Sequence, residues 1–180
     1  MMGYDVGKIR TFNFSVVTVC MIITLAGCGD SQVGSVDSNE GDNYSGPYPI
    51  RSVATVGMVA DIVRNVGGEH VAVEQLMGSG VDPHLYKTTR DDVQKIISGD
   101  IVFYSGLMLE GRMSDTFTRA GRGGKPVYAV TEKIGHDYLR EPPEFQGHWD
   151  PHVWMDITAW SQCVDVVTSA LADFDPDHAE

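Results

Sequence analysis

The chain has 180 residues, 42% of them hydrophobic, and carries a formal net charge of −12 with an isoelectric point near 4.7. This length and apolar content are enough for one hydrophobic core, so we expect one folded domain with additional segments. The excess of acidic residues argues against nucleic acid as a partner, because phosphate binding needs a basic surface. The same excess is compatible with binding a cation and with the solubility of an exported protein.

The N-terminus has the pattern of a lipoprotein signal peptide. Lys8 and Arg10 precede an apolar run at 12–26, which is shorter than the roughly 20 residues that a membrane-spanning helix needs. The run leads into Leu-Ala-Gly-Cys at 25–28, which resembles the lipobox of bacterial lipoproteins, so Cys28 is the predicted lipidation site. A signal with a coincidental cysteine and a signal anchor are the alternatives.

The cysteines agree with this interpretation. Cys20 lies inside the apolar run and Cys28 would carry the lipid, so Cys163 is the single cysteine of the remaining chain. We therefore expect no intramolecular disulfide and no CxxC metal or redox motif.

The composition divides the rest of the chain. Residues 29–50 are rich in glycine, serine, aspartate and asparagine, which predicts a flexible tether after the signal peptide at 1–28. From 51 to 174, β-branched runs alternate with segments of helical periodicity, which predicts an α/β lobe with a parallel sheet flanked by helices. The predicted strands are 52–56, 71–76, 100–106 and 125–130, and the predicted helices are 57–68, 88–99, 109–121 and 156–174.

The last of these helices has the clearest pattern. Apolar residues recur at spacings of three and four, and Asp156 is placed to cap the first turn. We expect this stripe to pack into the core; it consists of Ile157, Trp160, Val164, Val167, Leu171 and Phe174.

Asp175 and Pro176 have the pattern of a further helix start, in which a capping carboxylate precedes a proline. The chain stops where that helix should begin. Residues 175–180 are therefore expected to open a helix of a longer protein, with a frayed terminus as the alternative.

The tripeptide Asp-Pro-His occurs twice, at 82–84 and at 150–152. His84 follows the second predicted strand and His152 the fourth, and open parallel sheets bind ligands at the carboxyl ends of their strands. Each proline fixes its own φ and restricts the preceding aspartate, which stiffens the loop. Because neutral imidazole is the commonest metal ligand, we predict a divalent-metal site at His84 and His152, with two solvated loop histidines as the alternative.

Several neighbouring residues are weaker candidates. His148 is a candidate accessory ligand, although Pro151 argues against a helix that would place its ring beside His152. Asp82 and Asp150 are expected to orient the loops, with a hydrogen bond to a ligating ring as a further role. The histidines expected to lie in solvent are His70, His136 and His178.

Segments 77–113 and 147–160 resemble the metal-binding solute-binding proteins of bacterial ABC importers for zinc and manganese. The likeness rests on the G-x-D-P-H-x-Y loop, the G-L-x-L-E motif and D-P-H-V-W, and extends over about 52–180. It implies two α/β lobes joined by a long rigid helix, of which this chain would be the N-terminal lobe. It also implies that His84 and His152 are metal ligands, and that a His or Glu and an Asp come from a second lobe absent here.

The resemblance implies a function. We expect capture of Mn²⁺ or Zn²⁺ as a transported ligand outside the cytoplasmic membrane, and delivery to the membrane subunits of an ABC permease, by a lipid-anchored monomer that catalyses no reaction. The second Asp-Pro-His lacks the preceding His-rich loop of several zinc members, which favours manganese or mixed specificity. The alternatives are a metal-dependent hydrolase that uses the same two histidines and a metal-independent adhesin lipoprotein.

Overall fold

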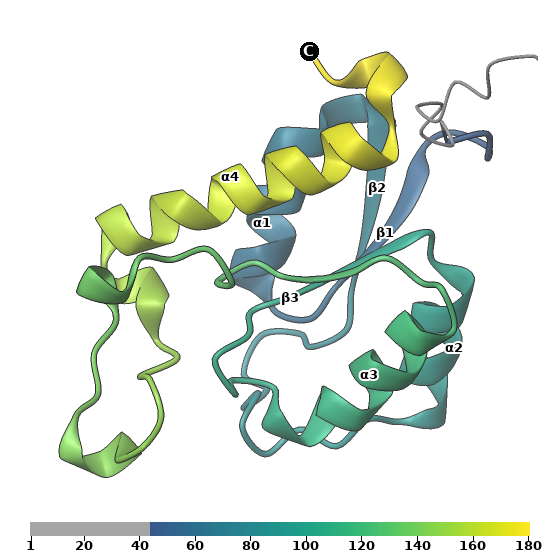
Figure 1. The fold of residues 1–180 in the computed structure, drawn as a ribbon. Helices are drawn as coiled ribbons and strands as arrows, with labels where there is room; N and C mark the ends of the chain where they lie inside the picture. Colours follow the sequence, from purple (N-terminus) through teal and green to yellow (C-terminus); the bar gives the residue numbers. More distant parts are fainter. Residues whose placement is uncertain (1–43) are drawn as a thin grey trace, which may run out of the picture. The chain divides into compact units, whose positions relative to one another are not determined.

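A four-stranded parallel sheet forms the centre of the computed structural model, which describes residues 44–180 (Figure 1). The strands lie in the order β2-β1-β3-β4. Their bounds are Ile50–Ala54 for β1, Val71–Gln75 for β2, Ile101–Tyr104 for β3 and Val127–Ala129 for β4. The predicted parallel α/β sheet is confirmed, whereas the predicted signal peptide and Cys28 lie outside the described residues.

Four α-helices connect or follow the strands: α1 (Gly57–Gly67), α2 (Arg90–Ser98), α3 (Ser114–Arg122) and α4 (Ile157–Phe174). α1 packs beside α4, and α2 packs beside α3 (Figure 1). The chain runs from β1 to β2 on one side of β1, and then returns to form β3 on the other side of β1. Since parallel crossovers are right-handed, this reversal places α1 and α2 on opposite faces of the sheet. No helix in the described part has the length and apolar character needed to cross a bilayer.

Side-chain caps determine where two helices begin. At α2, Thr89 and Asp92 form a reciprocal capping box. At α4, the Asp156 carboxylate accepts hydrogen bonds from the amides of Thr158 and Ala159, at 2.9 and 3.1 Å. The predicted cap of the last helix is therefore confirmed.

The predicted buried stripe of α4 is wrong in part. Ile157 is 85% exposed and Val164 is 38% exposed. The buried face consists of Ala159, Cys163, Val166, Val167, Ala170 and Leu171. A spacing of three and four fits more than one face of a long helix, and the contact with α1 selects among them.

The predicted tether at 29–50 extends too far. The Tyr44 ring packs against Phe174 at a centroid distance of 5.1 Å, and the Tyr48 hydroxyl donates to Asp175 at 2.9 Å. Ile50 is buried and begins β1, two residues before the predicted strand. Aromatic side chains supply enough apolar area to order a segment that is otherwise polar.

Candidate metal site

The two predicted histidines meet at the carboxyl edge of the sheet. The Nε2 atoms of His84 and His152 are 3.3 Å apart, and the ring centroids are separated by 5.3 Å. His84 lies in the loop after β2 and His152 in the loop after β4, and these are the two outer strands. The two loops therefore start from opposite edges of the sheet and approach each other at its carboxyl end.

The repeated tripeptide builds the same local structure twice. Asp82 Oδ1 accepts a hydrogen bond from the His84 amide at 2.9 Å, and Asp150 Oδ1 accepts one from the His152 amide at 3.0 Å. These are Asx turns, and the proline between the two residues restricts the backbone further. The predicted orienting role of both aspartates agrees with this geometry.

Asp150 also contacts the ring that it positions. Its Oδ1 lies 2.6 Å from His152 Nδ1. The hydrogen bond from the His152 amide, together with the His152 ring, lowers the pKa of the Asp150 carboxyl despite its partial burial. A carboxylate at Nδ1 assigns the ring proton to that nitrogen, which leaves the Nε2 lone pair facing His84.

A cavity of about 530 Å³ opens beside the pair, and its lining includes both imidazoles. The walls are largely apolar: Val56 follows β1, Met77 follows β2, and Leu109 follows β3. Trp154 also lines the cavity and its ring lies edge-on to His152 at 5.2 Å. The chain leaves the adjacent strands β1 and β3 in opposite directions, so the cavity lies at the switch point of the sheet, where α/β folds bind ligands.

Glu110 lies behind this wall and is only 2% exposed. Burial raises the pKa of its carboxyl group, against hydrogen bonds from Thr55, Ser105 and Gly106 that lower it. In the sequence Glu110 is visible only as the last letter of the G-L-x-L-E motif. No local pattern indicates its contact with Thr55, which is distant along the chain.

The structure does not bring His148 into the lining of this cavity. His148 lines a separate hollow of about 280 Å³ with Leu107, Met108 and Trp149 among its neighbours. Its accessory role stays a prediction. Among residues 44–180, no group of three or more histidine, cysteine, aspartate or glutamate side chains is arranged to hold a metal ion. His84 and His152 therefore form a pair of potential ligands rather than a complete site.

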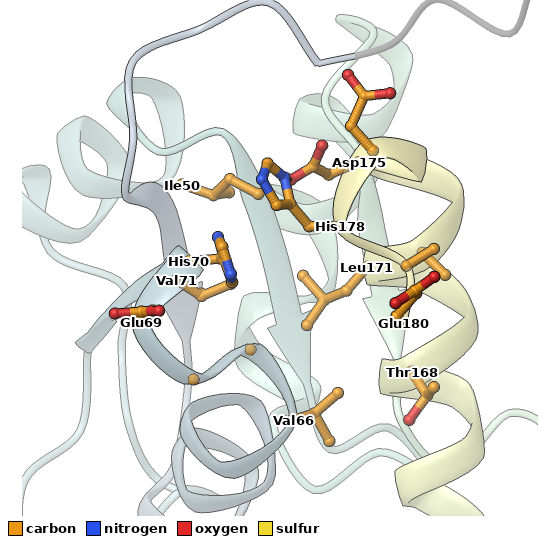
Figure 2. Close-up of a pocket in the computed structure, with 15 residues that line it drawn as sticks. Ile50, Val66, Glu69, His70, Val71, Thr168, Leu171, Asp175, His178 and Glu180 are labelled. Carbon is orange, nitrogen blue, oxygen red and sulfur yellow. The ribbon is translucent and has the colours of Figure 1, made fainter.

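A second cluster of histidines lies at the amino edge of the sheet (Figure 2). The His70 and His178 rings lie at a centroid distance of 4.2 Å with their planes tilted by 30°, and His178 Nδ1 lies 2.9 Å from Asp175 Oδ2. These residues line a hollow of about 600 Å³ with Ile50 and Val71, the first residues of β1 and β2. The expectation that His70 lies in solvent is wrong, since it is half-buried, while His136 is exposed as expected.

The family described as zinc-uptake complex component A periplasmic (ZnuA) matches residues 53–180. The manganese-binding lipoprotein MntA of Bacillus subtilis is 39% identical over 156 residues, 87% of this chain and 47% of that protein. The zinc-binding protein TroA of Treponema pallidum is 41% identical over 126 residues, 69% of this chain and 39% of that protein.

Solved structures of metal-binding proteins are also similar to this chain. The periplasmic zinc-binding protein TroA from Treponema pallidum superposes with a TM-score of 0.68 at 38% identity, over 74% of this chain and 47% of that chain. A manganese-bound periplasmic metal-binding protein from Candidatus Liberibacter asiaticus superposes with a TM-score of 0.62 at 28% identity, over 72% of this chain and 47% of that chain. The chain thus spans about half or less of the length of these relatives.

Proposed function

Since the chain belongs to the family of zinc-uptake complex component A, we propose that it captures a divalent transition-metal ion outside the cytoplasmic membrane for delivery to an ABC importer. The ion is Mn²⁺ or Zn²⁺, because the relatives are named as manganese- and zinc-binding proteins. His84 and His152 are its ligands in this chain, and the protein carries the ion without catalysing a reaction.

The distance between the two imidazole nitrogens carries this proposal. A tetrahedral ion with Zn–N bonds of about 2.05 Å holds two nitrogens roughly 3.3 Å apart. His84 Nε2 and His152 Nε2 are separated by 3.3 Å. A shared proton would also suit this distance, but both loops are held by Asx turns that fix the backbone of His84 and of His152 whichever species lies between the rings. A stiff pair loses little conformational entropy when it binds an ion.

Two imidazoles leave half of a tetrahedral coordination sphere open. We include in the proposal a second lobe, outside these 180 residues, that supplies the remaining ligands and closes over the ion. The limited share of each relative's length that this chain covers supports that part of the proposal. Lipid attachment at Cys28 and a monomeric state belong to the same proposal.

The choice between the two ions depends on ligands other than the imidazoles. Zn²⁺ outcompetes Mn²⁺ at most nitrogen and oxygen sites, so a manganese carrier needs carboxylates and a larger coordination number. Asp82 is the one acidic residue in the lining of the described cavity, and its carboxylate holds the His84 amide.

The test is metal analysis of the full-length protein. We expect about one equivalent of Mn²⁺ or Zn²⁺ in the wild type and loss of that metal in His84→Ala and in His152→Ala. His136→Ala is the matched control, because it removes an exposed imidazole away from the cavity. Metal should also raise the midpoint of thermal unfolding of the wild type and of the control only. Retention of metal by both His84→Ala and His152→Ala would refute the assignment of these two histidines as ligands.

A further inference from the structure

Glu110 is a buried carboxyl group to which the proposed function assigns no part. It accepts hydrogen bonds from the Thr55 hydroxyl at 2.5 Å, the Ser105 amide at 2.8 Å and the Gly106 amide at 3.2 Å. These donors are a hydroxyl and two backbone amides, so the carboxylate is satisfied by hydrogen bonds rather than by an ion pair. Burying such a group costs free energy unless its partners are arranged in advance.

Those partners belong to the two central strands. Thr55 directly follows β1, and Ser105 and Gly106 directly follow β3. The backbone continues the connection outward on both sides: the Met77 amide donates to the Thr55 carbonyl, and the Thr131 amide donates to the Ser105 carbonyl. One carboxylate therefore joins β1 to β3 at the switch point, and through their neighbours it links the ends of all four strands.

The turn between Ser105 and Glu110 has an unusual backbone. Gly106, Leu107 and Met108 all have positive φ, at 95°, 49° and 65°. Residues other than glycine rarely adopt a positive φ, and this conformation persists only where the surrounding structure imposes it. The Gly106 backbone also packs closely, since a Cβ there would lie 2.5 Å from Thr131 Oγ1. Two of the three Glu110 bonds go to the amides at the start of this turn.

The turn determines the position of Leu109. This residue is fully buried and lines the cavity beside His84 and His152. Met77, which the Thr55 carbonyl holds, is another buried apolar residue of the same lining. The contacts of the Glu110 carboxylate with both strands therefore lead to the apolar wall of the cavity that the histidine pair also lines.

We propose that Glu110 is a positioning residue for cation binding: its carboxylate holds the strained turn at 106–109 against β1 and β3, and so fixes the wall behind His84 and His152. The inference rests on the proposed function, because it concerns the affinity of that same pair. Glu110 acts through the backbone and does not touch the ion.

The test compares Glu110→Gln with wild type in the full-length protein. Glutamine keeps the shape but turns an NH₂ group toward backbone donors, which should release the Gly106 amide. We expect the dissociation constant for Zn²⁺ and for Mn²⁺, measured by titration calorimetry, to rise at least tenfold. Amide hydrogen exchange in the metal-free protein should become faster at 105–109.

Asp175→Asn is the matched control. Asp175 is a carboxyl group that is equally buried, at 3% exposed, but it lies at the amino edge of the sheet beside Tyr48 and His178. Both variants are expected to unfold at a lower temperature than wild type. Only Glu110→Gln should lose affinity, so Asp175→Asn should stay within twofold of wild type.

Affinity separates positioning from general destabilisation. If a variant only unfolds more easily, its apparent dissociation constant rises in proportion to the loss of folded, binding-competent protein. A variant that circular dichroism shows to be almost fully folded at the assay temperature therefore cannot lose tenfold through unfolding. If Glu110→Gln does not fold, Thr55→Val removes one donor with little change in shape, and a two- to fivefold loss is expected.

The outcomes are distinct. If wild type binds metal, His84→Ala does not, and Glu110→Gln binds as tightly as wild type, Glu110 has no positioning role and the proposed function stands. Where Glu110→Gln cannot be folded, an unchanged affinity in Thr55→Val overturns the positioning role in the same way. If wild type itself binds neither Zn²⁺ nor Mn²⁺, the proposed function falls and this inference falls with it.

Discussion

Removal of the Asp150 carboxylate should weaken cation binding by an amount that the geometry predicts. Asp150 Oδ1 contacts both the amide and the Nδ1 atom of His152, at 3.0 and 2.6 Å. In Asp150→Ala, the loop loses its turn and the ring loses the partner that leaves its Nε2 lone pair free. A ligating histidine depends on such a partner for its tautomer, its orientation and its basicity.

The size of the effect follows from exposure. A charge-assisted hydrogen bond contributes about 1.5–3 kcal/mol. The His152 and Asp150 side chains are 37% and 32% exposed, so water screens part of this interaction. We therefore expect a loss of about 1–2 kcal/mol in binding free energy, which corresponds to a roughly 5- to 30-fold rise in the dissociation constant. Asp150→Asn keeps an acceptor oxygen without its charge and should fall between wild type and Asp150→Ala.

Titration calorimetry with Zn²⁺ at pH 6, 7 and 8 measures the effect. Asp82→Ala is the control, since Asp82 holds the backbone of His84 through a single hydrogen bond, and it should lose less than Asp150→Ala. The pKa of Asp150 is lowered, so its contribution is complete above the ordinary value of 3.8 and is lost only as the pH falls through the lowered value. The Asp150 carboxylate should thus stay ionised from pH 6 to 8, so its own protonation does not change the comparison over this range. Equal affinities in wild type and Asp150→Ala would refute the role of this carboxylate.

Three further outcomes are expected. Asp156→Ala should lower the free energy of unfolding by about 1 kcal/mol in urea titrations, because it removes the N-cap of α4; an unchanged midpoint would contradict this. Cys163 is fully buried, and burial raises the pKa of its thiol to about 12, so mass spectrometry should find it unlabelled by iodoacetamide until the protein unfolds. Burial raises the pKa of Glu110, so its contribution to stability is complete below the ordinary value of 4.5 and is lost as pH rises through the raised value. The difference in free energy of unfolding between wild type and Glu110→Gln should accordingly be larger at pH 5 than at pH 8. A larger difference at pH 8 would contradict the raised pKa of Glu110.

The sequence predicted helices, strands and caps well where they depend on residues that are close together along the chain. Asp156 caps α4 as expected, and the four predicted strands occur with ends shifted by a few residues. Capping, periodicity and β-branched runs act between residues within a few positions of one another, so the sequence displays them directly. The tether prediction extended too far for the converse reason: Tyr44 and Tyr48 are ordered by Phe174 and Asp175, which are remote in the sequence.

The burial of α4 shows a different kind of limit. Ile157 and Val164 belong to the stripe of apolar residues, yet the helix buries the face that carries Ala159 and Cys163. Hydrophobicity alone favoured the larger side chains. The contact with α1 selected the face that is buried, and that contact is a property of the assembled layers.

The sequence by itself determined the alternation of strands and helices, the two Asp-Pro-His loops and the identity of His84 and His152 as candidate ligands, because each depends on neighbours along the chain. Only the tertiary structure decided that the two rings lie with their Nε2 atoms 3.3 Å apart, and that Glu110 joins the ends of β1 and β3. The strand order β2-β1-β3-β4 places β2 and β4 at opposite edges of the sheet, yet the loops that follow them meet at His84 and His152. Strand order arises from long-range pairing and crossover direction, which leave no periodic trace in the sequence.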